Sequence, residues 1–309
     1  MANLPSFTFA CPRCLTPLDQ TSPDEMCCPS DGLHFRRTGG VWRMLLPERA
    51  PFFAQFTREY ESVRRAEGRG DNRPEYYRAL PFHDLSGRMS GDWQIRAASF
   101  KAVIARVVTP LERKLARPLR ILDVGAGNGW LSTRLAQRGH AAAAVDLSTN
   151  DFDGLGCFRY YDAAFTPVQA EFDHLPFGEG SVDLVVFNAS FHYSTNYAST
   201  LREARRVLDA AGKTIVMDSP VYRRKTSGDQ MVHERQVEFS SKFGCPSNAL
   251  PSENFLTYQR LEELAAGSAG RVQLITPRYD FRWRLRPLKA RLLGRREPAK
   301  FHLIVFSNR

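Results

Sequence analysis

The 309-residue chain is long enough for one substantial domain and a small accessory unit. It has no run of eighteen uncharged apolar residues, and its N-terminus lacks the basic and apolar regions of a signal peptide, which predicts a cytoplasmic protein without a membrane span. Six cysteines without an export signal favour thiols or metal ligands over disulfides. The formal charge of +10 is concentrated in residues 277–300, where nine Arg or Lys residues stand against Asp280 and Glu297.

Residues 1–47 are predicted to form a small metal-binding ribbon. Two turn-forming segments, CPRC and CCPSD, carry its cysteines, and GGVWRMLLP contains a closing strand. The CxxC spacing supplies two thiolates to tetrahedral zinc. In the second segment an aspartate occupies the position where a fourth cysteine is expected. We predict zinc ligands at Cys11, Cys14, Cys28 and Asp31, with Cys27 or His34 as alternative ligands; a ribbon that has lost its metal is the competing interpretation.

Residues 48–118 form a helical, aromatic-rich region. In its second helical pattern, apolar residues recur at spacings of three and four, which predicts one buried face at Trp93, Phe100, Ile104, Val107 and Leu111. The intervening residues 68–84 are rich in Gly, Asp, Asn and Pro and are predicted to be a loop. We expect this region to cover a binding site formed by the rest of the chain.

After Leu119, predicted strands and helices alternate. The strands are expected at 119–124, 141–147, 167–171, 182–188, 213–219, 272–276 and 301–307, and the helices near 128–138, 196–208 and 253–266. This alternation predicts an α/β fold with a largely parallel sheet covered by helices on both faces.

A glycine-rich turn, ILDVGAGNGW, follows the first of these strands. A dinucleotide-binding fingerprint requires a third glycine where this chain has Trp130, so a nicotinamide cofactor is disfavoured. A tight turn without a ligand is the alternative. Two further strands end in acids: Asp146 can accept both hydrogen bonds of a ribose diol, and Glu171 can accept from an adenine amino group. These residues predict a nucleoside-bearing ligand at the strand ends.

Residues 119 to about 220 resemble the class I S-adenosylmethionine (SAM)-dependent methyltransferases across successive motifs. The resemblance implies a Rossmann-like seven-stranded sheet with its last strand antiparallel and SAM lying across the strand ends. It implies that Asp123 and the glycines hold the methionine part of SAM, Asp146 the ribose, and Glu171 with Phe172 the adenine. The full expected cofactor-binding set is Asp123, Gly125, Ala126, Gly127, Asn128, Asp146, Leu147, Glu171, Phe172 and Asn188. The N-terminal ribbon resembles the zinc modules that precede methyltransferase domains, including those of bacterial ribosomal RNA guanine methyltransferases.

The methyl acceptor is expected beside the end of the fourth strand. There His192 is a candidate general base and Tyr193 a candidate orienting group, with Asp218 as a second candidate base. Positioning without any base is the alternative. Residues 219–252 are too long for an ordinary connection and are predicted to cover the acceptor. The expected acceptor contacts in this insertion are Tyr222, Arg223, His233 and Arg235.

In the basic segment 277–300, arginines at 282, 284 and 286 alternate with apolar residues, which predicts a strand with one cationic face. The sequence PLKARLLGRR also suits a basic amphipathic helix, and RNA, anionic lipid and an acidic substrate are the candidate partners. A solvated cationic face without a partner is the alternative interpretation. The leading prediction is an enzyme that transfers a methyl group from SAM to a small or lipid-like acceptor. An RNA methyltransferase is the second candidate, and a non-catalytic module that binds SAM or nucleic acid is a candidate of another class.

Overall fold

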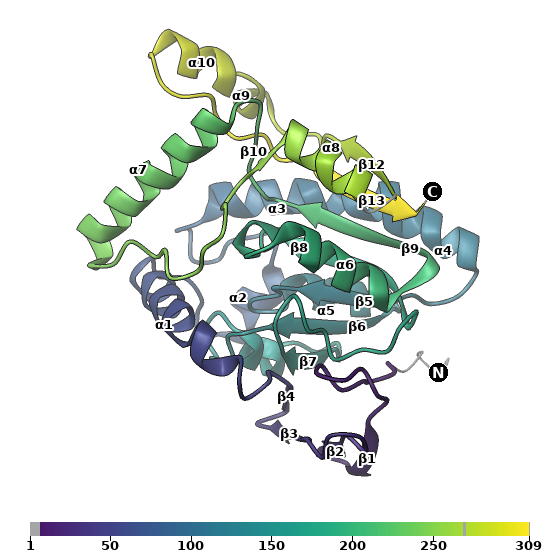
Figure 1. Cartoon of the computed structure of the whole chain (residues 1–309). Coiled ribbons are helices and arrows are strands. Elements are labelled where there is room, and N and C mark those ends of the chain that lie inside the picture. The colour runs from purple at the N-terminus through teal and green to yellow at the C-terminus, as the bar shows by residue number, and fades with distance from the viewer. Residues whose placement is uncertain (1–6, 268–269, 309) are drawn as a thin grey trace.

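The computed structural model describes residues 7–267 and 270–308, which build around one mixed sheet of eleven strands in the order β1-β2-β3-β4-β7-β6-β5-β8-β9-β13-β12 (Figure 1). Seven of these strands correspond to the seven predicted from the sequence. Their bounds are β5 (Arg120–Val124), β6 (Ala141–Asp146), β7 (Thr166–Gln169), β8 (Val182–Asn188), β9 (Leu208–Met217), β12 (Gly270–Ile275) and β13 (Leu303–Asn308).

Strands β5 to β9 pair in parallel, whereas β13 is antiparallel to both β9 and β12. The antiparallel last strand agrees with the resemblance. Because parallel strands end at the same edge, the ends of β5, β6, β7 and β8 lie together. This edge therefore brings Asp123, Asp146, Glu171 and Asn188 close to one another.

The expectation of a sheet limited to seven strands is wrong, because the N-terminal ribbon extends it. The ribbon consists of β1 (Asp19–Ser22), β2 (Glu25–Cys27), β3 (His34–Thr38) and β4 (Val41–Arg43). Strand β4 pairs in parallel with β7, with Trp42 opposite Val168. The pairing covers an edge of β7 that would otherwise be open. The rings of Phe9 and Phe177 stack at 5.3 Å, so ribbon and sheet share one apolar core.

The seven-stranded part is buried on both faces. In β8, Val185 and Phe187 point into one core, and Leu184 and Val186 point into the other. The first core is covered by α6 (Tyr197–Val207) and α8 (Tyr258–Gly267). The second is covered by α5 (Trp130–Gln137) and by the long helical run α3 (Ser90–Val103), η1 (Ile104–Val108) and α4 (Thr109–Leu115), which crosses behind the sheet in Figure 1.

The structure explains the tryptophan in the glycine-rich turn. Trp130 is 2% exposed, and its ring centroid lies 6.0 Å from that of Trp93 and 5.9 Å from that of Phe100. The residue therefore anchors α3 against the start of α5. Of the predicted apolar face, Trp93, Val107 and Leu111 are buried, while Phe100 and Ile104 are partly buried against the same core.

The prediction that residues 68–84 are a loop is wrong in part. They contain α2 (Pro74–Ala79), whose first position is a proline. Proline suits this position because its missing N–H would have no intrahelical acceptor. Tyr77 is fully buried, and its ring stacks on that of Tyr160 at 4.7 Å, in η2 (Leu155–Tyr160). Packing of these tyrosines thus outweighs the loop-forming composition.

The C-terminal third also departs from expectation. The insertion 219–252 contains β10 (Val221–Tyr222) and α7 (Lys225–Phe243). Strand β10 pairs with β11 (Leu256–Thr257), so the helix predicted near 253–266 begins only at Tyr258, as α8. The strand predicted in the basic segment is wrong: the structure has α9 (Phe281–Arg284) and α10 (Arg286–Leu292). The Asp280 carboxylate accepts a hydrogen bond from the Trp283 N–H at 2.7 Å and caps α9, favouring the helix. Within residues 7–267 and 270–308, no helix is both long and apolar enough to cross a bilayer.

Candidate functional site

The glycine-rich turn joins β5 to α5 in a conformation that only glycine adopts without strain. Gly125, Gly127 and Gly129 have φ angles of 73°, 55° and 79°. A Cβ on Gly125 would lie less than 3.0 Å from Ser190 Cβ, closer than real carbon atoms approach. The Gly127 N–H donates to Asp146 Oδ2 at 2.8 Å, which ties the turn to the end of β6.

Asp123 lies beneath this turn. Its side chain is fully buried, Ser132 donates to Oδ2 at 2.9 Å, and Oδ1 has no hydrogen-bond partner among the described residues. Burial raises the pKa of this carboxyl to about 7. A buried carboxylate oxygen without a partner fits a cationic group of a bound ligand, such as the amino group of the methionine part of SAM.

Asp146 ends β6 and lines the cavity above the turn. One carboxylate oxygen accepts from the Gly127 N–H and the other from the Ser148 N–H, each at 2.8 Å. Each oxygen retains a second lone pair. The fixed carboxylate can therefore accept two hydroxyl hydrogen bonds, as a ribose diol requires.

Glu171 is 3% exposed and receives two hydrogen bonds from Arg49, at 2.7 and 2.8 Å, while His174 Nδ1 lies 3.0 Å from the same carboxylate. Burial alone would raise the pKa of Glu171, but the hydrogen bonds from Arg49 and His174 outweigh burial and lower it. The carboxylate thus stays ionised beside the ring of Phe172, and both side chains line the cavity.

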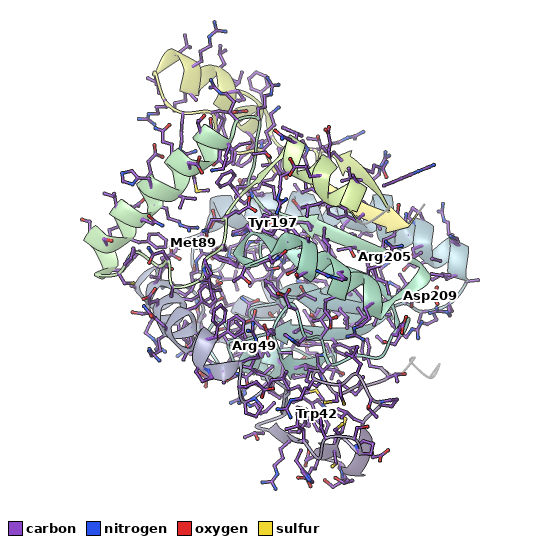
Figure 2. The ribbon with its side chains drawn as sticks, in the orientation of Figure 1. Trp42, Arg49, Met89, Tyr197, Arg205 and Asp209 are labelled. Atoms are coloured by element: carbon purple, nitrogen blue, oxygen red, sulfur yellow. The ribbon has the colours of Figure 1, made fainter. Side chains whose placement is uncertain are left out.

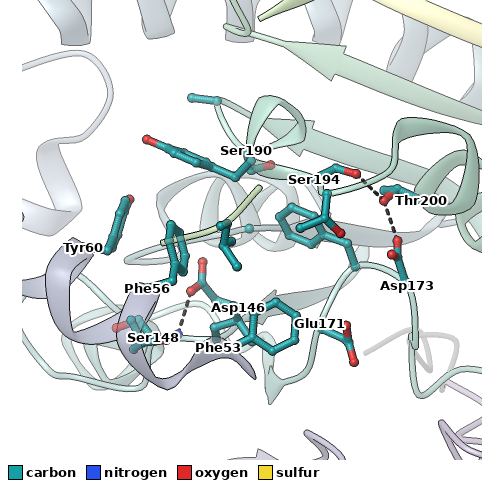
Figure 3. A pocket seen from close by; sticks show the side chains of 18 residues that line it. Phe53, Phe56, Tyr60, Asp146, Ser148, Glu171, Asp173, Ser190, Ser194 and Thr200 are labelled. Carbon is teal, nitrogen blue, oxygen red and sulfur yellow. Dashed lines mark hydrogen bonds between the residues drawn. The ribbon is translucent and has the colours of Figure 1, made fainter. Parts of the chain in front are cut away.

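The cavity contains about 730 Å³ of unfilled space, counting the part open to solvent. Figure 3 shows the aromatic side chains of Phe53, Phe56 and Tyr60 beside Asp146, on a helix at the left of the view. This helix is α1 (Ala50–Ala66), so a part of the N-terminal helical region lines the cavity. The full lining is Phe53, Phe56, Thr57, Tyr60, Gly125, Asp146, Leu147, Ser148, Glu171, Phe172, Asp173, Ala189, Ser190, Tyr193, Ser194, Thr195, Thr200 and Leu250.

Polar contacts tie α1 to the loops at the strand ends. Besides Arg49 at its start (Figure 2), Glu61 accepts a hydrogen bond from Ser148 at 2.6 Å, and Arg64 donates to Asp153 at 2.6 Å. Arg49 and the aromatic residues Phe53, Phe56 and Tyr60 line or border the site without having been predicted as site residues. The spacing of three and four between those aromatics was the available signal, since it places them on one helical face.

The remaining cofactor-site candidates, Ala126, Asn128 and Asn188, are buried and, like Asp123 and Gly127, do not line the cavity. The Asn128 side chain donates to Asp153 at 3.3 Å and accepts from the Trp130 N–H at 3.2 Å. The Ala126 N–H donates to the Val145 carbonyl, so it is not free for a ligand. Asn188 is buried, and its Oδ1 lacks a hydrogen-bond partner in the part of the chain described.

Only one of the three candidate catalytic residues lines the cavity. Tyr193 does so, with its ring centroid 5.8 Å from that of Phe56 and 6.0 Å from that of Tyr60. His192, in η3 (Phe191–Tyr193), is buried beside Ser219, with Nδ1 3.2 Å from its Oγ. Burial and, to a smaller extent, the positive charge of Arg235 lower its pKa to about 3, so it is a weak base and stays neutral.

Asp218 also faces away from the cavity. It accepts a hydrogen bond from Ser99 at 2.6 Å, beneath α3, and burial raises its pKa. Its φ of 55° is unusual for a residue other than glycine and turns the chain sharply after β9. Neither His192 nor Asp218 is therefore placed to take a proton from a group in the cavity.

The four acceptor contacts predicted in the insertion do not line the cavity either. Tyr222 is buried against Phe255, and Arg235 donates to Asn254 at 2.7 Å. His233 lines a separate hollow, and Arg223 is exposed. His233 and Arg235 lie on α7, which contributes no residue to the described lining of the cavity. The insertion contributes Leu250 to the cavity instead.

The ribbon brings together the four predicted metal ligands. One ligand atom each from Cys11, Cys14, Cys28 and Asp31 lies within 4.8 Å of all the others, and the sulfurs of Cys14 and Cys28 are 3.4 Å apart. Tetrahedral zinc bound to two thiolates separates their sulfurs by about 3.8 Å, so the cluster fits zinc after a small adjustment. The two alternative ligands, Cys27 and His34, lie 3.7 Å from each other and outside this group.

Comparison with known proteins agrees with this geometry. Residues 122–216 match the family described as a methyltransferase domain. The malonyl-[acyl-carrier protein] O-methyltransferase of Geobacter sulfurreducens is 39% identical over 127 residues, 39% of this chain and 46% of the relative. The sarcosine/dimethylglycine N-methyltransferase of Halorhodospira halochloris is 33% identical over 115 residues, 36% of this chain and 41% of the relative.

Among solved structures, the magnesium protoporphyrin IX methyltransferase of Synechocystis PCC 6803 aligns with a TM-score of 0.46 at 14% identity, covering 84% of this chain and 97% of that chain. The chain spans less than half the length of the two curated relatives named above. The match lies over the glycine-rich turn and the acids at the strand ends. Residues 122–216, about a third of the chain, are therefore similar to a methyltransferase domain.

Proposed function

We propose that the whole chain is an enzyme that transfers a methyl group from SAM to a small, largely apolar acceptor. The observation that carries this proposal is the cavity, in which Asp146 and Glu171 face aromatic side chains of α1. The sulfonium of SAM supplies an already activated methyl group. The chain's own contribution is to hold donor and acceptor in line, and such positioning can lower a barrier by about 7 to 11 kcal/mol.

In this proposal, different residues bind different parts of SAM. Asp123, beneath the glycine-rich turn, holds the amino group of the methionine part, Asp146 holds the ribose, and Glu171 with Phe172 holds the adenine. Phe53, Phe56, Tyr60 and Tyr193 exclude water from the transfer path and offer apolar surface to the acceptor. Because His192 and Asp218 point elsewhere, we favour an acceptor atom that needs no general base, such as a carboxylate oxygen.

The relatives support an acyl acceptor of this kind, since several are named malonyl-[acyl-carrier protein] O-methyltransferases. An RNA base is the second candidate. It is less well supported, because none of the described residues of the cationic segment 277–300 lines the cavity, and the described lining contains acids but no Lys or Arg. The third candidate function is a module that binds SAM without turning it over.

One experiment separates these candidates. Purified protein is incubated with SAM and a cell extract divided into RNA, lipid, acyl-carrier protein and metabolite fractions, and S-adenosylhomocysteine is measured. We expect turnover with the lipid, acyl-carrier or metabolite fraction, and little with RNA. Turnover with RNA alone would replace the leading candidate by the second, and SAM binding without turnover on any fraction would favour the third.

We also propose that Cys11, Cys14, Cys28 and Asp31 bind a structural zinc ion. Burial raises the pKa of the Cys11 thiol to about 12, so a cation is needed to hold it as a thiolate at neutral pH. Such a metal would fasten the turns of the ribbon beside the edge strand β4.

Metal analysis of the purified protein tests the zinc proposal. We expect about one zinc per chain in the wild type and in Cys27→Ser, whose thiol lies outside the cluster, and loss of zinc in Cys14→Ser. Asp31→Cys should retain zinc more strongly against a chelator, because thiolate is a softer ligand than carboxylate. Less than about 0.2 zinc per chain in the wild type would refute the proposal.

A further inference from the structure

The two short C-terminal helices form one helical run with an apolar stripe that faces solvent. The Leu285 N–H donates to the Phe281 carbonyl at 3.2 Å, and the Lys289 N–H donates to the Leu285 carbonyl at 3.0 Å, so the turns continue from α9 into α10. Phe281, Leu285, Leu288 and Leu292 follow at spacings of four, three and four, which is one face of a helix. These side chains are 70%, 41%, 57% and 77% exposed, respectively.

The stripe is not part of the core, although the run is fastened to the body. The ring of Trp283 lies 5.1 Å from that of Tyr279 and 5.6 Å from that of Phe301, just before β13. Arg286 packs over the Trp283 ring at 3.8 Å. Figure 1 shows α10 projecting beyond the sheet, next to the end of α7. Single exposed leucines are common on proteins, but an ordered row of them indicates an interaction surface.

Positive charge flanks this stripe. The groove between α7 and α10 is lined by Arg286, Lys289, Arg295 and Arg296, and its acidic member, Glu234, is paired with Arg296 at 2.5 Å. Within the described ranges, Lys289, Arg291 and Arg295 make no ion pair. The surface thus offers apolar side chains together with cations that have no acidic partner of their own.

We propose that the α9–α10 run docks on the surface of an anionic lipid bilayer. Phe281, Leu285, Leu288 and Leu292 would enter the boundary between headgroups and acyl chains, while Lys289, Arg291 and the groove contact lipid phosphates. This combination is the one expected of an interfacial helix. Nucleic acid would use the cations but leave the leucine row in water, so it explains less of the surface.

Vesicle flotation with the full-length protein tests the proposal. We expect binding to vesicles of phosphatidylcholine mixed with phosphatidylglycerol and weak binding to phosphatidylcholine alone. The double variant Leu288→Glu/Leu292→Glu should weaken partitioning into the vesicles about tenfold or more, because it places charge on the helical face that would enter the bilayer. Lys289→Glu/Arg291→Glu should also weaken it about tenfold and reduce its dependence on salt. The matched control is Val237→Glu on α7, at a side chain 56% exposed, which should bind as the wild type does.

Three outcomes would overturn the proposal. The first is failure of the wild type to bind anionic vesicles, and the second is undiminished binding by the leucine variant, which would mean attraction by charge alone. The third is saturable binding of an acidic carrier protein or RNA by the same surface without vesicle binding. SAM affinity is measured on each variant in parallel. Since the surface contributes no residue to the SAM cavity, unchanged SAM affinity shows that a variant is folded and separates this proposal from the proposed function.

Discussion

Arg49 and Glu171 are 122 residues apart in the sequence and form an ion pair with two hydrogen bonds, at 2.7 and 2.8 Å. The guanidinium comes from the residue before α1, and the carboxylate follows β7 and lines the cavity. The pair therefore links the covering helix to the cofactor site. It also means that Glu171 is held in place before any ligand arrives.

Replacing Arg49 should weaken the attachment of α1 to the loops at the strand ends. In Arg49→Met, the nearly buried Glu171 carboxylate loses two charge-assisted hydrogen bonds, and we expect the free energy of unfolding to fall by about 1–2 kcal/mol, the lower part of the usual range because the guanidinium is partly exposed. Hydrogen exchange should speed up in α1. Arg58→Met, an exposed arginine of the same helix, is the control and should change neither quantity. Equal protection of α1 in both variants would contradict this role.

The same ion pair predicts an acid-dependent change. The folded-state pKa of Glu171 is lower than its ordinary value, so its stabilisation is fully present above that ordinary value, near 4.5, and is lost as the pH falls through the lower folded-state value. We expect the difference in unfolding free energy between wild type and Arg49→Met to shrink below about pH 4. A difference that stays constant through that range would show that Arg49 acts through packing alone.

The buried carboxyl of Asp123 predicts that SAM binding depends on pH near neutrality, well above the range in which Glu171 titrates. Its carboxyl has a pKa of about 7 in the free protein, so it is mostly protonated below that pH, whereas a ligand ammonium group favours the ionised form. SAM affinity should therefore rise between about pH 5 and pH 7, by up to about tenfold per pH unit, and then level off. Calorimetry in buffers of different ionisation enthalpy should detect proton release. Asp123→Asn should bind more weakly and lose the slope; an unchanged slope would remove Asp123 as its source.

Two glycines of the turn provide a matched pair. Gly125→Ala and Gly127→Ala both force alanine into positive φ, at a cost of about 1–2 kcal/mol. A Cβ at Gly127 meets only the Asp153 carbonyl at 3.5 Å, whereas one at Gly125 collides with Ser190. Chemical denaturation should show Gly125→Ala to be less stable than Gly127→Ala by at least about 1 kcal/mol. Equal losses would mean that Ser190 moves aside without cost.

The sequence was sufficient to predict the central sheet because its signals are local and repeated. Apolar strands, each followed by a helix, specify a parallel sheet, and acids after successive strands must then meet at one edge. Asp123, Asp146 and Glu171 lie where this logic places them. The predicted metal ligands Cys11, Cys14 and Cys28 also come together, because their spacing within two short turns restricts the geometry.

The parts that the sequence did not predict depend on contacts between distant segments. The pairing of β4 with β7 is set by the open edge of the sheet, and the orientation of His192 is set by Ser219 on the next strand connection. Alternation of Arg and apolar residues in 281–286 suggested a strand, but the Asp280 cap and the ring of Trp283 on Phe301 favour a helix. A period of two over six residues was too short to decide.

The central claim is that SAM binds at the carboxyl edge of the sheet with its ribose on Asp146. Calorimetric titration of SAM into the wild type and into Asp146→Ala tests it most directly, with Glu179→Ala as an exposed control. We expect saturable binding by the wild type and the control, and affinity lower by about one to two orders of magnitude in Asp146→Ala, since a buried diol would lose its acceptor. Absence of binding by the folded wild type, or equal affinity in all three proteins, would contradict the account.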